Sequence, residues 1–189
     1  MIEPSLRRLI DAASNHVSLP RWRSLPGPEW LEGLILAESG GDAGATRFEK
    51  HHDAQADGDA PGVDDGLSED DRSYGLMQIM GTNLRRMVGV QPGVPMDFSW
   101  ALRPLANLAF GLRMLCEEIR RAEDQVGADD IAGGSKAVDI ALARWNGGGR
   151  GNGPLEYPNL RNWSYVERVE SHARKAHEDR KRMGWRVVG

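Results

Sequence analysis

Apolar residues recur every three or four positions along residues 105–119, and this spacing restricts the fold more than any other feature of the chain. It predicts a helix that begins near Pro104 and carries one continuous apolar stripe, which must be buried. The stripe consists of Leu105, Leu108, Leu112, Leu115, Cys116 and Ile119. No segment alternates apolar and polar residues for long enough to predict a strand. The sequence therefore predicts a mainly α fold with this helix at its centre.

Further helices are predicted by the same spacing, together with capping residues and helix-ending glycines. They cover residues 5–16, 28–39, 82–88, 135–146 and 163–183. Pro28 suits a first helical turn, and we expect Thr82 and Ser135 to act as N-caps. Because 189 residues suffice for one domain with a core of its own, we expect a single domain over residues 1–189.

Charge and cysteine content exclude several classes of protein. The 24 basic and 28 acidic residues give a net charge of −4, which disfavours the broad basic surface of a nucleic-acid-binding protein. Cys116 is the single cysteine, so an internal disulfide and a cysteine-based zinc site are both excluded. We expect a monomer that has no cofactor, no metal and no nucleic-acid partner.

The start of the chain lacks the basic and then apolar order of a secretory signal, and no run of about 18 apolar residues occurs. These features predict a protein that is made in the cytoplasm without a signal peptide and does not insert stably into a membrane.

Residues 50–72 contain eight acidic residues with scattered glycines and prolines and almost nothing apolar. This composition predicts a solvated loop. Its aspartates do not follow the spacing of a calcium-binding EF-hand loop, and His51-His52 has no third ligand spaced to join it.

Glu38 interrupts the apolar face of the helix predicted over residues 28–39, because it lies four residues after Leu34 and three after Ile35. Burial and the negative end of the helix dipole should both raise the pKa of this carboxyl. A carboxylic acid that stays protonated near neutral pH is what a glycosidase needs to protonate a leaving oxygen. The structural alternative is a glutamate that reaches solvent at a fraying helix end.

Four segments in a fixed order strengthen the catalytic interpretation. They are LILAESGG at 34–41, SYGLMQIM at 73–80, ALARWNGG at 141–148 and NWSYVERV at 162–169. Together they resemble the soluble lytic transglycosylase domain of the lysozyme-like superfamily, to which goose-type lysozymes are related. The resemblance covers about residues 28–175, and the Gly-Leu-Met-Gln-Ile-Met run is its most specific part.

The resemblance implies a lysozyme-like fold with a substrate groove between a helical core and a smaller lobe around residues 40–100. Glu38 would be the single catalytic acid. The implied substrate-binding residues are Ser39, Ser73, Tyr74, Gln78, Met80, Trp145, Asn146 and Tyr165. Trp145 stands where the family usually has a tyrosine, and Tyr165 matches a later tyrosine that could return the hydroxyl. On structural grounds alone, Trp145 and Tyr165 would be core residues.

The chemistry implied is cleavage of the β-1,4 bond between N-acetylmuramic acid and N-acetylglucosamine in peptidoglycan glycan strands. In the related transglycosylases one glutamate protonates the glycosidic oxygen and then accepts the proton of the muramic 6-hydroxyl, which gives a 1,6-anhydro product. Pro104, Asn107, Gly111 and Leu115 match the middle helix of the family, where the role of these positions is packing.

The acidic insertion departs from the family pattern and leaves two alternatives open. Glu49, just before the insertion, could hold a water opposite Glu38 and make the enzyme a hydrolytic muramidase that uses a second carboxylate. A protein of another class, an inactive glycan-binding or virion structural protein, could retain the same fold. For an active enzyme we expect a setting in phage lysis or wall penetration, in which it reaches the cell wall after release, by export or within a phage particle.

Overall fold

The computed structural model forms two compact units, which we describe separately. The hairpin unit consists of residues 38–111, and the helical unit consists of residues 2–37 and 112–189. Helices α2 (Gly27–Ser39) and α4 (Pro104–Val126) contribute residues to both units. The structure describes residues 2–49, 69–91, 94–126, 135–147 and 162–185.

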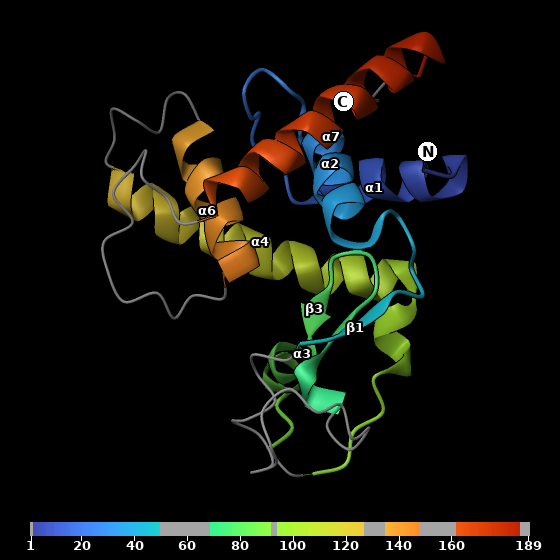
Figure 1. Ribbon diagram of the computed structural model, residues 1–189, viewed down its shortest axis with the longest axis vertical. Helices are drawn as coiled ribbons and strands as arrows, with labels where there is room; N and C mark the ends of the chain where they lie inside the picture. The colour runs from blue at the N-terminus through green and yellow to red at the C-terminus, as the bar shows by residue number, and fades with distance from the viewer. Residues whose placement is uncertain (1, 50–68, 92–93, 127–134, 148–161, 186–189) are drawn as a thin grey trace. The chain divides into compact units, whose positions relative to one another are not determined.

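Helices make up most of the described chain, which confirms the prediction of a mainly α protein (Figure 1). They are α1 (Pro4–His16), α2 (Gly27–Ser39), α3 (Gly81–Val88), α4 (Pro104–Val126), α6 (Ser135–Gly147) and α7 (Trp163–Arg182). Every helix for which both ends were predicted begins and ends within one residue of the predicted bounds. The cap expected at Thr82 is wrong, because α3 begins at Gly81 and Thr82 lies in its first turn. No helix of the described segments is long and apolar enough to cross a membrane.

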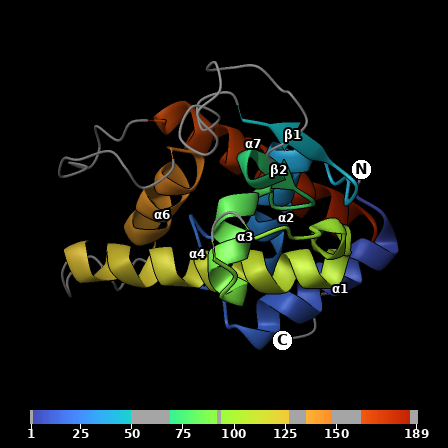
Figure 2. The same cartoon turned by 90° about the horizontal axis from the view of Figure 1, so that it is seen from below.

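A small antiparallel sheet lies in the hairpin unit, so the expectation of no strands is wrong. Its strands are β1 (Thr46–Phe48), β2 (Arg72–Tyr74) and β3 (Ile79–Met80), in the order β1-β2-β3. Figure 2 shows β1 beside β2, where Arg47 lies opposite Ser73, and Ser73 in turn lies opposite Met80 of β3. Strands of two or three residues are too short to display an alternating pattern in the sequence.

The solvated loop predicted over residues 50–72 ends earlier than expected. Residues 50–68 lie outside the described part, but Glu69–Asp71 form a turn of 3-10 helix and Arg72 begins β2. Asp70 accepts two hydrogen bonds of 2.9 Å from the side chain of Arg85, and Asp71 is only 1% exposed. The last part of this acidic segment is therefore structured, and the Asp70 carboxylate ties it to α3.

The predicted stripe on α4 is confirmed at four positions and wrong at one. Leu108, Leu112, Leu115 and Ile119 are buried and Cys116 is partly buried, whereas Leu105 is 64% exposed. The exposure of Leu105 follows from its place in the first turn of the helix, directly after Pro104.

In the helical unit, α2 and α7 approach each other closely at Gly33. A Cβ atom at this position would lie 2.6 Å from the backbone nitrogen of Ala173, so only glycine fits there. Residues 27–35 of α2 are all buried, and Trp30 and Leu31 are fully enclosed. Trp22 packs edge to face against Trp30, with 6.3 Å between the ring centroids.

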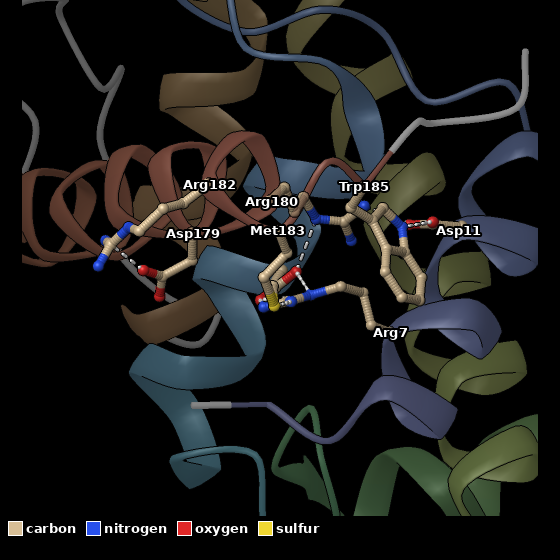
Figure 3. A network of polar contacts seen from close by, with 8 residues as sticks. Arg7, Asp11, Asp179, Arg180, Arg182, Met183 and Trp185 are labelled. Carbon is tan, nitrogen blue, oxygen red and sulfur yellow. Dashed lines mark hydrogen bonds and ion pairs between the residues drawn. The ribbon is translucent and has the colours of Figure 1, made fainter.

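A buried ionic cluster joins α1, α2 and α7 within the helical unit (Figure 3). We call Arg7, Asp11, Glu32, Arg180 and Trp185 the Glu32 cluster. The Glu32 carboxylate is 1% exposed and accepts hydrogen bonds from Arg7, at 2.5 and 3.0 Å, and from Arg180, at 2.8 Å. Arg180 also donates to Asp11 at 2.7 Å, and the indole nitrogen of Trp185 donates to the other oxygen of Asp11. The cluster therefore holds the first and last described helices to α2.

We expect Glu32→Gln to lower the free energy of unfolding by about 3 kcal/mol or more, because it leaves two guanidinium groups buried without a carboxylate between them. Urea denaturation measures this loss. Glu178→Gln is the matched control, since Glu178 is exposed on α7. Equal stabilities of the two variants would contradict the role assigned to Glu32.

Candidate active site in the hairpin unit

Glu38 lies in the last turn of α2 and is partly buried. The next residue, Ser39, donates a hydrogen bond from its hydroxyl to the carbonyl oxygen of Leu76 at 2.9 Å, and it accepts one from the amide of Gly41 at 3.2 Å. Leu76 belongs to the Gly-Leu-Met-Gln segment. Two of the four segments identified in the sequence therefore meet in space at Ser39.

The Gly75–Gln78 segment is the four-residue turn that connects β2 to β3. The side chain of Asn107, which is fully buried on α4, makes three hydrogen bonds around it. Its amide nitrogen donates to the carbonyl oxygens of Tyr74 at 2.8 Å and Ala101 at 2.9 Å, and its amide oxygen accepts from the backbone amide of Met77 at 2.8 Å. One side chain thus fixes the backbone on both sides of Leu76.

Glycines allow this close approach. Gly75 has φ of +71°, and a Cβ on it would lie 2.4 Å from the amide nitrogen of Asn107. A Cβ on Gly111 would lie 2.3 Å from the sulfur of Met77. Gln78 itself has φ of +44°, a conformation that costs a non-glycine residue roughly 1–2 kcal/mol. A strained residue that its surroundings hold in place is a common mark of a functional site.

Gln78, Ser73 and Glu49 form one polar network. The Ser73 hydroxyl oxygen lies 2.7 Å from Oε1 of Glu49 and 3.1 Å from Oε1 of Gln78. Arg47 donates from Nε to the same Glu49 oxygen at 2.7 Å. The structure therefore brings together three of the residues named from the sequence, one of which is the candidate second carboxylate.

Tyr74 and Met80 flank this network on β2 and β3. The Tyr74 ring is 3% exposed and stacks on Phe98, with 5.2 Å between the ring centroids. Its hydroxyl donates to the carboxylate of Glu69 at 2.5 Å. Burial, and after it the hydrogen bond to Glu69, raises the pKa of the Tyr74 hydroxyl well above its ordinary value, so the hydroxyl keeps its proton. Tyr74 therefore serves the packing of the hairpin, whereas Met80 is only partly buried.

The remaining sequence-predicted site residues lie in the helical unit. Trp145 and Asn146 are near the end of α6, where Trp145 is partly buried and Asn146 is exposed. Tyr165 is 3% exposed in the first turn of α7, and the guanidinium carbon of Arg168 lies 5.1 Å from the centre of its ring. Within the described segments, no group of three or more histidine, cysteine, aspartate or glutamate side chains could hold a metal ion.

Comparison of the chain with protein-family models, with curated proteins and with solved structures finds no match.

Asn107 and Arg47 are the residues whose importance the sequence interpretation missed. The resemblance assigns Asn107 to packing. Its contribution is polar, because its side chain forms hydrogen bonds with backbone groups of the turn between β2 and β3. The sequence feature that could have pointed to Asn107 is its place directly before Leu108 of the apolar stripe and four residues before Gly111. Arg47 gives no such signal, because an arginine two residues before a glutamate is common on any surface.

We expect Asn107→Ala to lower the free energy of unfolding by about 2 kcal/mol or more, because the Met77 amide and two carbonyl oxygens lose their buried partner. Asn83→Ala on α3 is the matched control, since Asn83 is partly buried and makes no hydrogen bond through its side chain with the described residues. Urea denaturation compares the two proteins, and a similar loss in both would show that the three hydrogen bonds of Asn107 contribute little.

Proposed function

We propose that the protein has a lysozyme-like fold and is a peptidoglycan lytic transglycosylase. It would cleave the β-1,4 bond between N-acetylmuramic acid and N-acetylglucosamine with Glu38 as its one catalytic acid and base. The observation that supports this most is the hydrogen bond of 2.9 Å from Ser39 to Leu76, because it ties the residue after Glu38 to the turn that carries Gln78.

The position of Glu38 suits proton donation. It is partly buried in the C-terminal turn of α2, where the negative end of the helix dipole favours the protonated form of a carboxyl. Its proton would pass to the glycosidic oxygen as the bond to the anomeric carbon breaks. The resulting carboxylate would then accept the proton of the muramic 6-hydroxyl as that oxygen closes on the same carbon, so no water enters the product.

A hydrolytic muramidase is the second candidate, and the hydrogen bonds of the Glu49 carboxylate favour it. Arg47 and Ser73 both donate to Oε1 of Glu49, whereas Oε2 accepts no hydrogen bond from the described residues. A carboxylate oxygen that is not engaged in this way could hold and activate a water, as the second carboxylate of an inverting glycosidase does.

We expect Glu38→Gln to abolish the clearing of purified cell walls, measured as loss of turbidity, while circular dichroism shows an unchanged fold. The amide keeps the shape of the side chain but has no catalytic proton to give. Glu167→Gln, on the exposed face of α7, is the control and should clear walls normally. Wild-type activity in the Glu38→Gln protein would refute the assignment, and a wild-type protein that binds walls without clearing them would favour an inactive glycan-binding or virion structural protein.

Mass spectrometry of digested peptidoglycan separates the two enzymatic candidates. We expect 1,6-anhydro-muropeptides, which are lighter than the hydrolysed products by one water. Products that carry the additional water, and that take up the label when the digestion is run in H₂¹⁸O, would identify a hydrolase.

The biological setting is a separate proposal. A role in phage lysis or wall penetration would bring the enzyme to the glycan strands that the proposed reaction requires.

Trp145, partly buried on α6, would offer an aromatic face to a sugar ring. The alternative is a core role for Trp145, because Val138, Ala141 and Leu142 on the same side of α6 are buried.

A further inference from the structure

Three hydrogen-bond acceptors lie around the hydroxyl of Ser73, more than its single proton can satisfy. Its oxygen lies 2.7 Å from Oε1 of Glu49, 3.1 Å from Oε1 of Gln78 and 3.4 Å from the carbonyl oxygen of Arg47. A serine hydroxyl has one proton to donate. At most one of these three oxygens can therefore receive it.

The orientation of the Gln78 amide is fixed independently. Its Nε2 donates to the carbonyl oxygens of Gly75 at 2.9 Å and Ala45 at 3.2 Å. An amide turned the other way would place its oxygen against both carbonyl oxygens and lose both bonds. Oε1 of Gln78 is therefore the atom that faces Ser73.

Glu49 is the acceptor to which the Ser73 hydroxyl donates its proton. Its oxygen is the nearest of the three, and it also forms an ion pair of 2.7 Å with Nε of Arg47. Hydrogen bonds to a charged acceptor are shorter and about twice as strong as those between neutral groups. None of the described residues then directs a proton at Oε1 of Gln78, although the residue is only 9% exposed. A buried acceptor left in this state loses free energy until a donor reaches it.

We propose that Glu49 is a positioning residue: by holding the Ser73 proton, it keeps Oε1 of Gln78 open to accept a hydrogen bond from an N–H or O–H group of a saccharide. This inference rests on the proposed function, because the saccharide supplies the missing donor. It gives Glu49 a task in binding that requires no activated water. In the absence of Glu49, the Ser73 proton turns to Gln78 and satisfies one of the two lone pairs of Oε1, so a hydrogen bond from the saccharide then gains less free energy.

The test is a double-mutant cycle in the full chain that carries Glu38→Gln, so that no cleavage occurs during titration. Isothermal titration with chitotetraose measures affinity. We expect Glu49→Ala to weaken binding about fivefold to tenfold, because the saccharide then reaches an acceptor that Ser73 already satisfies in part. Adding Ser73→Ala to the Glu49→Ala protein should then restore part of the affinity, because Oε1 of Gln78 no longer accepts from Ser73. The same change gives no such gain when Glu49 is present.

Glu49→Gln is the conservative variant, because its amide oxygen can still accept from both Arg47 and Ser73, and it should lose less affinity than Glu49→Ala. Melting temperatures identify any variant that fails to fold, and the side-chain amide resonance of Gln78 should shift in Glu49→Ala and shift back when Ser73→Ala is added. Affinity that is unchanged or falls when Ser73→Ala is added to Glu49→Ala overturns this proposal. A parent protein that neither binds chitotetraose nor, with Glu38 restored, cleaves peptidoglycan overturns the proposed function instead.

Discussion

The buried carboxylate of Glu32 is the interaction on which the helical unit depends. Two arginines from opposite ends of the chain, Arg7 and Arg180, share it, so the desolvation of three charges is compensated only when α1, α2 and α7 are all in place. The contact of Gly33 with Ala173 adds a steric requirement to this electrostatic one, since α7 reaches α2 only where no side chain intervenes. Packing and charge therefore specify the same arrangement of these helices.

The hairpin unit is organised differently. Its three strands are too short to stabilise a sheet by themselves, and isolated hairpins are marginal in water. Asn107 supplies what the strands lack, because a single buried amide binds the backbone at Tyr74, Met77 and Ala101. The strain at Gln78 persists because the turn around it is held on several sides. A small, strained turn that is fixed by hydrogen bonds is a suitable place for groups that must hold their positions while a ligand binds.

Helices could be read from the sequence because their signal is spread over many residues. The apolar positions of α4 and the end of α2 at Gly40-Gly41 follow from spacing and from glycine alone. The strands could not be predicted, since two or three residues contain no period. Proximity of Glu49 to Ser73 could not be predicted either, because 24 positions separate them and the intervening residues show no apolar periodicity that would predict how the chain returns. The resemblance of the four segments named both Ser73 and Gln78 as substrate-binding residues. The antiparallel pairing of β2 with β3 then brings their side chains within hydrogen-bond distance. The lysozyme-like fold and the catalytic role of Glu38 stay predictions.

The fit of Gly75 against Asn107 has a consequence for how such a chain can change during evolution. A side chain at position 75 would collide with the amide of Asn107, and a side chain longer than asparagine at position 107 would collide with the backbone of Gly75. Position 75 therefore cannot accept a side chain while Asn107 is retained, so we expect glycine at 75 wherever asparagine stands at 107. Sequence divergence around the turn would then proceed through the exposed residues of β1 and α3, while the glycine at 75 stays constant wherever Asn107 does.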